Sequence, residues 1–147
     1  MGTLERIVIE ALTWQQTPWH HMAGLKGIGC DCVGLLYGVG KALGLVARDW
    51  RPPVYSKEWH LHRHEELLRT TMESLGCLEV PLDARQPGHI LLFQYGHVAS
   101  HAGILVSRNP ERLIHARLNE RVACHGLSGH LLERLRAAYA FPERHYT

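Results

Sequence analysis

The sequence predicts an α+β fold in one domain over residues 1–147, with N-terminal helices packed on a C-terminal antiparallel sheet. Apolar residues recur at helical spacing in the first half, whereas short apolar runs bounded by turn residues follow Pro81. Helices first and a strand meander afterwards are typical of the α+β class. A chain of 147 residues suits one domain with a substantial core.

Three helices are expected in the first half of the chain. Apolar spacing predicts a helix over residues 4–14, which Thr17 and Pro18 end before a glycine-punctuated loop. Residues 32–46 are uncharged except for Lys41, so we expect a buried central helix there. A further helix is expected over residues 56–75, with Gly76 as its stop.

The second half predicts a meander of short strands. Apolar runs separated by turn residues predict strands over residues 89–93, 101–107, 113–118 and 122–127. A short helix is expected over 128–136 and a last strand over 138–141.

Composition excludes several classes of function. A formal charge of +2, without a dense basic run, argues against a nucleic-acid partner. No apolar run approaches the length of a membrane span, so no membrane partner is expected. The N-terminus has no signal-peptide pattern, so we expect synthesis in the cytoplasm. In that compartment cysteines are expected to be thiols rather than disulfides. The four cysteines of the chain are Cys30, Cys32, Cys77 and Cys124.

Cys32 is the leading candidate for a catalytic nucleophile. It follows Asp31, a potential N-cap, at the start of the central helix, where the helix dipole favours the reactive thiolate. His101 and His115 lie on two predicted strands and offer a base and a partner for it. The alternatives are that Cys32 is a small buried hydrophobe, that His115 is a satisfied strand histidine, and that His97 is the base.

Residues 31–35, 101–104 and 114–116 resemble the three blocks of the NlpC-type cell-wall peptidases, which are papain-like cysteine enzymes. Residues 17–21, 26–32 and 87–93 resemble the branch found in phage tails and gene-transfer particles. The likeness extends from about residue 4 to residue 141.

The resemblance implies a role for each matching residue. Cys32 would be the nucleophile, His101 the base and His115 the residue that orients it. Trp19 and Asp31 are candidates for contacts with substrate or oxyanion. This chain departs from the family at Trp19, where tyrosine is usual, and at His89, where aspartate is common.

Two further clusters invite a metal-site interpretation. Cys30 could join Cys32 and a nearby histidine, but the C-x-C spacing is unlike that of zinc knuckles. His60, His62 and His64 could be ligands, a polar helix face or, with Glu58 and Trp59, one wall of a groove. We therefore predict that no metal or organic cofactor is needed.

The resemblance implies an endopeptidase that cuts peptidoglycan stem peptides between D-glutamate and a diamino acid. Its expected partners are peptidoglycan and the tip or hub proteins of a phage-like tail. The alternatives are a non-catalytic tail-assembly module, an amidase or acyltransferase acting nearby, and a zinc-binding protein.

Overall fold

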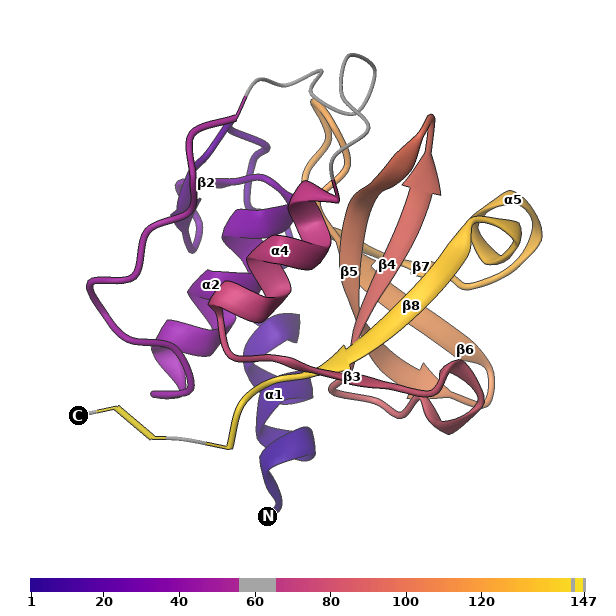
Figure 1. Ribbon diagram of the computed structural model, residues 1–147, viewed down its shortest axis with the longest axis horizontal. Coiled ribbons are helices and arrows are strands. Elements are labelled where there is room, and N and C mark those ends of the chain that lie inside the picture. Colours follow the sequence, from indigo (N-terminus) through magenta and orange to yellow (C-terminus); the bar gives the residue numbers. More distant parts are fainter. Residues whose placement is uncertain (56–65, 144, 147) are drawn as a thin grey trace.

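The computed structural model describes residues 1–55, 66–143 and 145–146 (Figure 1). Its helical elements are α1 (Thr3–Leu12), α2 (Cys32–Ala42), α4 (Leu67–Ser74), the 3-10 turn η1 (Leu82–Ala84) and α5 (Gly129–Glu133). Its strands are β1 (Gly24–Leu25), β2 (Gly29–Cys30), β3 (Leu78–Val80), β4 (Ile90–Tyr95), β5 (Val98–Arg108), β6 (Glu111–His115), β7 (Ala123–Gly126) and β8 (Leu135–Ala140).

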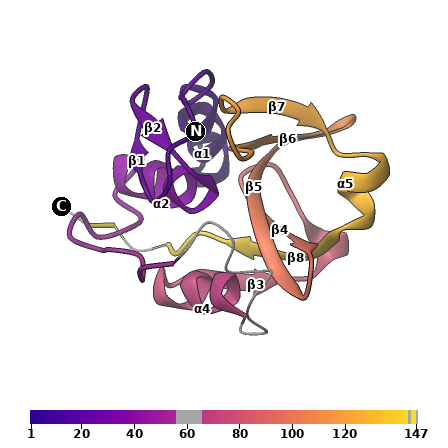
Figure 2. The ribbon, with the colours of Figure 1, turned by 90° about the horizontal axis from the view of Figure 1, so that it is seen from above.

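The main sheet has six antiparallel strands in the order β3-β8-β4-β5-β6-β7. Figure 2 shows that the sheet curls strongly and that α1, α2 and α4 lie against one side of it. The short helix α5 lies on the other side, where it links β7 to β8. The expected α+β architecture, with N-terminal helices on an antiparallel sheet, is confirmed.

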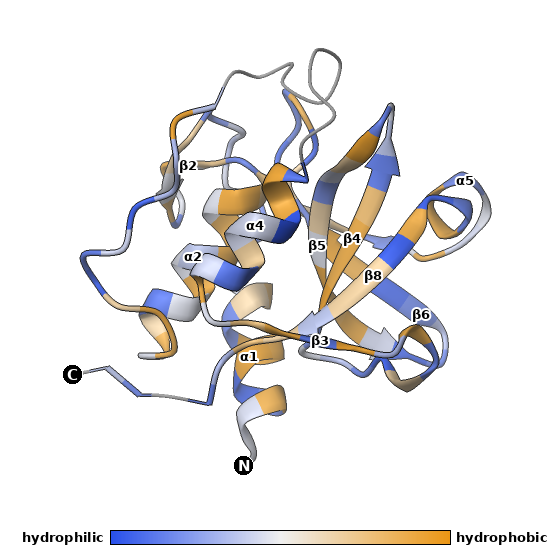
Figure 3. Cartoon of the chain, viewed as in Figure 1, coloured by the Kyte–Doolittle hydropathy of each residue, from blue (hydrophilic) through white to orange (hydrophobic). Residues whose placement is uncertain are grey.

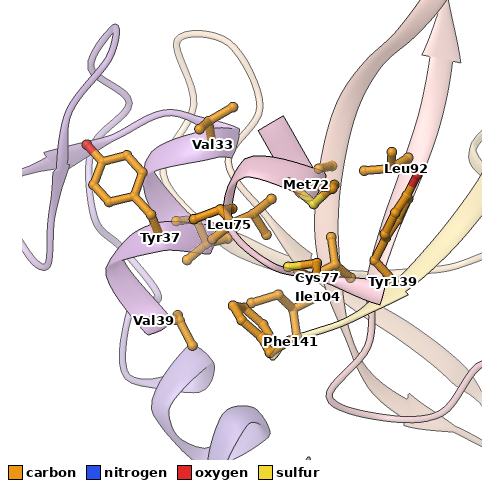
Figure 4. Packing of buried hydrophobic residues seen from close by; sticks show 14 of the residues in the cluster. Val33, Tyr37, Val39, Met72, Leu75, Cys77, Leu92, Ile104, Tyr139 and Phe141 are labelled. Atoms are coloured by element: carbon orange, nitrogen blue, oxygen red, sulfur yellow. The ribbon is translucent and has the colours of Figure 1, made fainter. Parts of the chain in front are cut away.

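Strand alternation divides the core into two clusters. On β5, Ile104 packs with the helices in the larger cluster, whereas Leu105 belongs to a smaller cluster on the opposite face. Figure 4 shows residues of α2 and α4 meeting sheet residues such as Leu92 and Ile104. The strand β4 is apolar along most of its length, and α2 is largely apolar as well (Figure 3).

Several predicted boundaries differ from the structure. The central helix ends at Ala42 rather than at residue 46, because Gly44 adopts a left-handed conformation with φ of 72°. Of the helix expected over 56–75, residues 56–65 lie outside the described part, and α4 covers Leu67–Ser74. The predicted stop at Gly76 is confirmed, again with positive φ.

The sequence predicted only part of the last strand, β8, and did not predict the edge strand β3 that pairs with it. Strand β8 begins at Leu135, within the stretch expected to be helical, because it pairs with β4 as an interior strand of the sheet. The edge strand β3 carries mostly exposed side chains, so it lacks the apolar run by which the other strands were predicted. In the described residues, no helix is long and apolar enough to cross a membrane.

Candidate active site

Cys32 is the first residue of α2, and Asp31 caps the helix as expected. The backbone N–H of Gly34 donates to Oδ1 of Asp31 over 2.8 Å, which satisfies one of the free N–H groups of the first turn. The cap fixes the direction in which the chain enters the helix. Cys32 is therefore held at the positive end of α2.

Asp31 also joins two other segments to the helix start. Its Oδ2 accepts hydrogen bonds from the backbone N–H of Met22, over 2.8 Å, and from the hydroxyl of Tyr55. Asp31 is 5% exposed, so each of these bonds operates away from bulk water. Both carboxylate oxygens thus organise the surroundings of Cys32, while a substrate or oxyanion contact of Asp31 stays a prediction.

The two predicted histidines are brought together on β5 and β6. His101 Nε2 and His115 Nδ1 are 2.8 Å apart. Gly103 is the register partner of His115, so the ring of His101, two residues earlier on the same face, reaches it diagonally. His115 is 1% exposed and His101 is half-buried. This geometry leaves Nδ1 of His101 as the nitrogen available for other chemistry.

His101 lies on the face of β5 that carries the smaller hydrophobic cluster. It shares this face with Gly103 and Leu105, whereas Ala102 and Ile104 on the opposite face belong to the larger cluster. The ring of His101 packs near Phe93 and Tyr95, with centroids 5.9 and 6.2 Å away. His101 lines one opening together with Cys32, the first residue of α2.

That opening is a pocket of about 440 Å³, within the usual size of small-ligand sites. It contains the thiol and the imidazole together with aromatic and charged side chains. Its lining residues are Trp19, His21, Asp31, Cys32, Tyr55, Tyr95, Ser100, His101, Ala116, Arg117 and Leu118.

Both reacting groups are neutral at pH 7 in this structure. Burial, followed by the charge of Asp31, raises the pKa of Cys32 to about 12, although backbone hydrogen bonds with Ala102 and Val33 act the other way. Burial, followed by the charge of Arg117, lowers the pKa of His101 to about 4. The expected preformed thiolate is therefore wrong, because desolvation outweighs the helix dipole. The arrangement suits removal of the thiol proton by His101 during attack.

Alkylation of the thiol tests this protonation state. Below a pKa of about 12 the thiolate fraction rises with pH, so the rate with iodoacetamide at Cys32 should climb about tenfold per pH unit between pH 7 and 10. Asp31→Asn removes the negative charge that raises the pKa of Cys32, and it keeps an oxygen that accepts from the backbone N–H of Gly34. This variant should therefore be alkylated faster at each pH. Mass spectrometry of peptides containing Cys32 measures both. A rate that levels off near pH 8.5 would contradict the raised pKa.

The sequence reasoning missed Tyr55 and His125. Tyr55 follows two prolines without a motif, and only the fold brings it to Asp31. His125, on β7, has Nδ1 2.8 Å from Nε2 of His115. The two-residue period of a strand could have indicated this contact. His125 and Ala123 share a strand face, and Ala123 is the register partner of His115.

Neither His97 nor Cys30 lines the pocket. His97 is exposed in the turn between β4 and β5. Cys30 is fully buried, and burial raises the pKa of its thiol to about 12. His60, His62 and His64 lie outside the described residues. Within the described part of the chain, no group of three or more His, Cys, Asp or Glu side chains is arranged to hold a metal ion.

The arrangement of helices and strands defines the class of fold. The helices-on-sheet arrangement matches solved structures of NlpC/P60 domains. No family model and no curated protein matches the sequence.

Two similar structures illustrate the match. The NlpC/p60 domain of the peptidoglycan hydrolase SagA has a TM-score of 0.64 and 15% identity, over 95% of this chain and 99% of that one. An NLP/P60-family protein from Staphylococcus aureus subsp. aureus Mu50, described as similar to lipoprotein, has a TM-score of 0.67 and 18% identity over 97% of this chain. This chain spans 42% of the length of the Staphylococcus aureus protein.

Proposed function

We propose that this protein is a cysteine endopeptidase that hydrolyses the peptide stems of peptidoglycan. One observation carries the proposal: Cys32 and His101 line the same pocket, and His101 is hydrogen-bonded to the buried His115 over 2.8 Å. A thiol, an imidazole and a residue that orients the imidazole are the parts that nucleophilic acyl transfer needs.

The reaction follows from the protonation states. The thiol of Cys32 attacks the amide carbon while its proton passes to Nδ1 of His101, and a carbon–sulfur bond forms. His101 gives that proton to the departing nitrogen, and the carbon–nitrogen bond breaks. A water molecule, deprotonated by His101, then attacks the thioester carbon and forms a carbon–oxygen bond. The carbon–sulfur bond breaks, the acyl product leaves as a carboxylic acid, and His101 returns the proton to the sulfur of Cys32. The backbone N–H of Cys32 at the helix start is a candidate donor to the oxyanion.

The pocket lining fits a peptide substrate that carries a carboxylate. Trp19, His21, Tyr55 and Tyr95 provide aromatic surface, and Arg117 provides a positive charge at the rim. Stem peptides present free carboxylates, which Arg117 can pair with. We propose cleavage between D-glutamate and the diamino acid, with the protein serving at the tip of a phage-like tail. The tail role rests on the sequence blocks at residues 17–21, 26–32 and 87–93.

The departure at His89 does not support the non-catalytic alternative. His89 is buried beyond the pocket, and its Nδ1 accepts a hydrogen bond from the backbone N–H of Gln86 over 3.0 Å. His89 thereby closes the turn with a side-chain acceptor, as the aspartate common in the family would. Trp19, the other departure, lines the pocket beside Cys32.

Digestion of purified sacculi tests the proposed function. The wild-type protein should release muropeptide fragments in which the diamino acid carries a new free amine, identified by tandem mass spectrometry. Fragments cut at the sugar–peptide junction would instead indicate an amidase. No release from sacculi of several cross-link types would contradict the enzyme and favour a binding module.

A further inference from the structure

We infer that His125 is a positioning residue that fixes the proton of His101 on the nitrogen away from the thiol. The inference rests on the proposed function for its role in a reaction, whereas the hydrogen-bond arrangement itself stands on geometry. His101, His115 and His125 lie on three neighbouring strands, β5, β6 and β7. Their rings form a line with N···N distances of 2.8 and 2.8 Å and centroid separations of 5.0 and 5.0 Å.

The centre of the line can hold only one proton. His115 uses both ring nitrogens in these bonds, and a neutral imidazole carries a single N–H. Burial, followed by the charges of His101, His125 and Arg117, lowers the pKa of His115 to about 2, so this ring is neutral. His115 must therefore donate to one neighbour and accept from the other.

Two directions of donation follow, and only one gives a base. In the first, Nε2–H of His101 donates to His115, Nε2–H of His115 donates to Nδ1 of His125, and Nδ1 of His101 is bare. In the second, Nδ1–H of His125 donates inward, every bond reverses, and Nδ1 of His101 carries the proton. A protonated Nδ1 cannot accept the proton of Cys32. An acceptor at position 125 thus selects the reactive form of His101.

The position of His125 separates this role from substrate contact. Its side chain is half-buried on β7 and is not part of the pocket lining. Among the described residues, no buried side-chain nitrogen or oxygen lacks a hydrogen-bond partner. Removing the side chain of His125 would leave Nε2–H of the buried His115 without a hydrogen-bond acceptor. His115 would then no longer favour accepting a hydrogen bond from Nε2–H of His101.

Two substitutions at His125 test the inference. His125→Leu removes the acceptor at similar volume and should lower kcat on sacculus peptides by on the order of 10- to 100-fold with KM unchanged. His125→Asn places a carboxamide oxygen near the position of Nδ1 and should restore kcat to within about threefold of wild type. Circular dichroism and thermal melting show that each variant is folded. Equal kcat values for both variants would overturn the inference.

A second measurement does not depend on turnover. In ¹⁵N-histidine-labelled wild-type protein, long-range ¹⁵N–¹H correlations should show His101 and His115 as Nε2–H tautomers. His125→Leu should alter this pattern at His101, two rings away, and His125→Asn should keep it. A wild-type His101 protonated at Nδ1 would overturn the inference even if sacculi are cleaved. If sacculi are not cleaved but the tautomers are as stated, the proposed function fails and the assignment of the line stands.

Discussion

Cys32→Ala is expected to reduce fragment release from sacculi by on the order of 10⁴-fold or more. The substitution removes the atom that forms the thioester. Because Cys32 is half-buried at the start of α2, loss of its sulfur leaves the cap at Asp31 intact and the fold unchanged. Release of soluble muropeptides, followed by chromatography over time, measures the effect.

Cys124→Ala is the matched control for this experiment. Cys124 is also a half-buried free thiol, but it lies on β7 outside the pocket lining. This variant should release fragments at close to the wild-type rate. Equal release by wild type and Cys32→Ala would end the enzyme interpretation.

Gly34→Ala should destabilise the protein by about 3 kcal/mol and abolish cleavage. A Cβ at this position would lie 1.7 Å from the carbonyl oxygen of Ala23 and 2.7 Å from its carbonyl carbon. The obstacle is backbone, so the loop before β1 and the first turn of α2 must move apart. That movement strains the bonds from Gly34 and Met22 to Asp31 and displaces Cys32. The midpoint of urea unfolding, together with sacculus cleavage, measures both effects.

Gly126→Ala provides the comparison, because its Cβ would meet only Ser128 Oγ at 3.9 Å. This variant should change the free energy of unfolding by no more than about 0.5 kcal/mol. A Gly34→Ala protein as stable and as active as wild type would show that the close approach of the two segments is not required.

The parts of the site that sequence could predict are those encoded by local pattern. Asp31 before an apolar run predicts a cap and a helix start, and both are present. The apolar runs around His101 and Ile114 predict neighbouring strands, and these strands pair. Such features depend on neighbours within a few residues, which is what a sequence displays.

The missing parts depend on distant segments. Tyr55 reaches Asp31 across 24 positions of sequence, and no pattern near Pro53 announces it. His125 lies in a four-residue strand of intermediate burial, so its approach to His115 follows from register and not from hydrophobic pattern. The protonation of Cys32 was wrongly expected because the helix dipole is local, whereas burial is set by the whole fold.

The two reacting atoms are carried by different layers of the molecule. The sulfur comes from the helical layer, through α2, and the imidazole comes from β5. Their alignment is consequently a measure of how tightly those layers are docked through contacts such as Val33, Leu35 and Ile104. A substitution in the packed core between α2 and the sheet, far from any substrate, can abolish catalysis by shifting the two layers slightly, while every helix and strand stays formed.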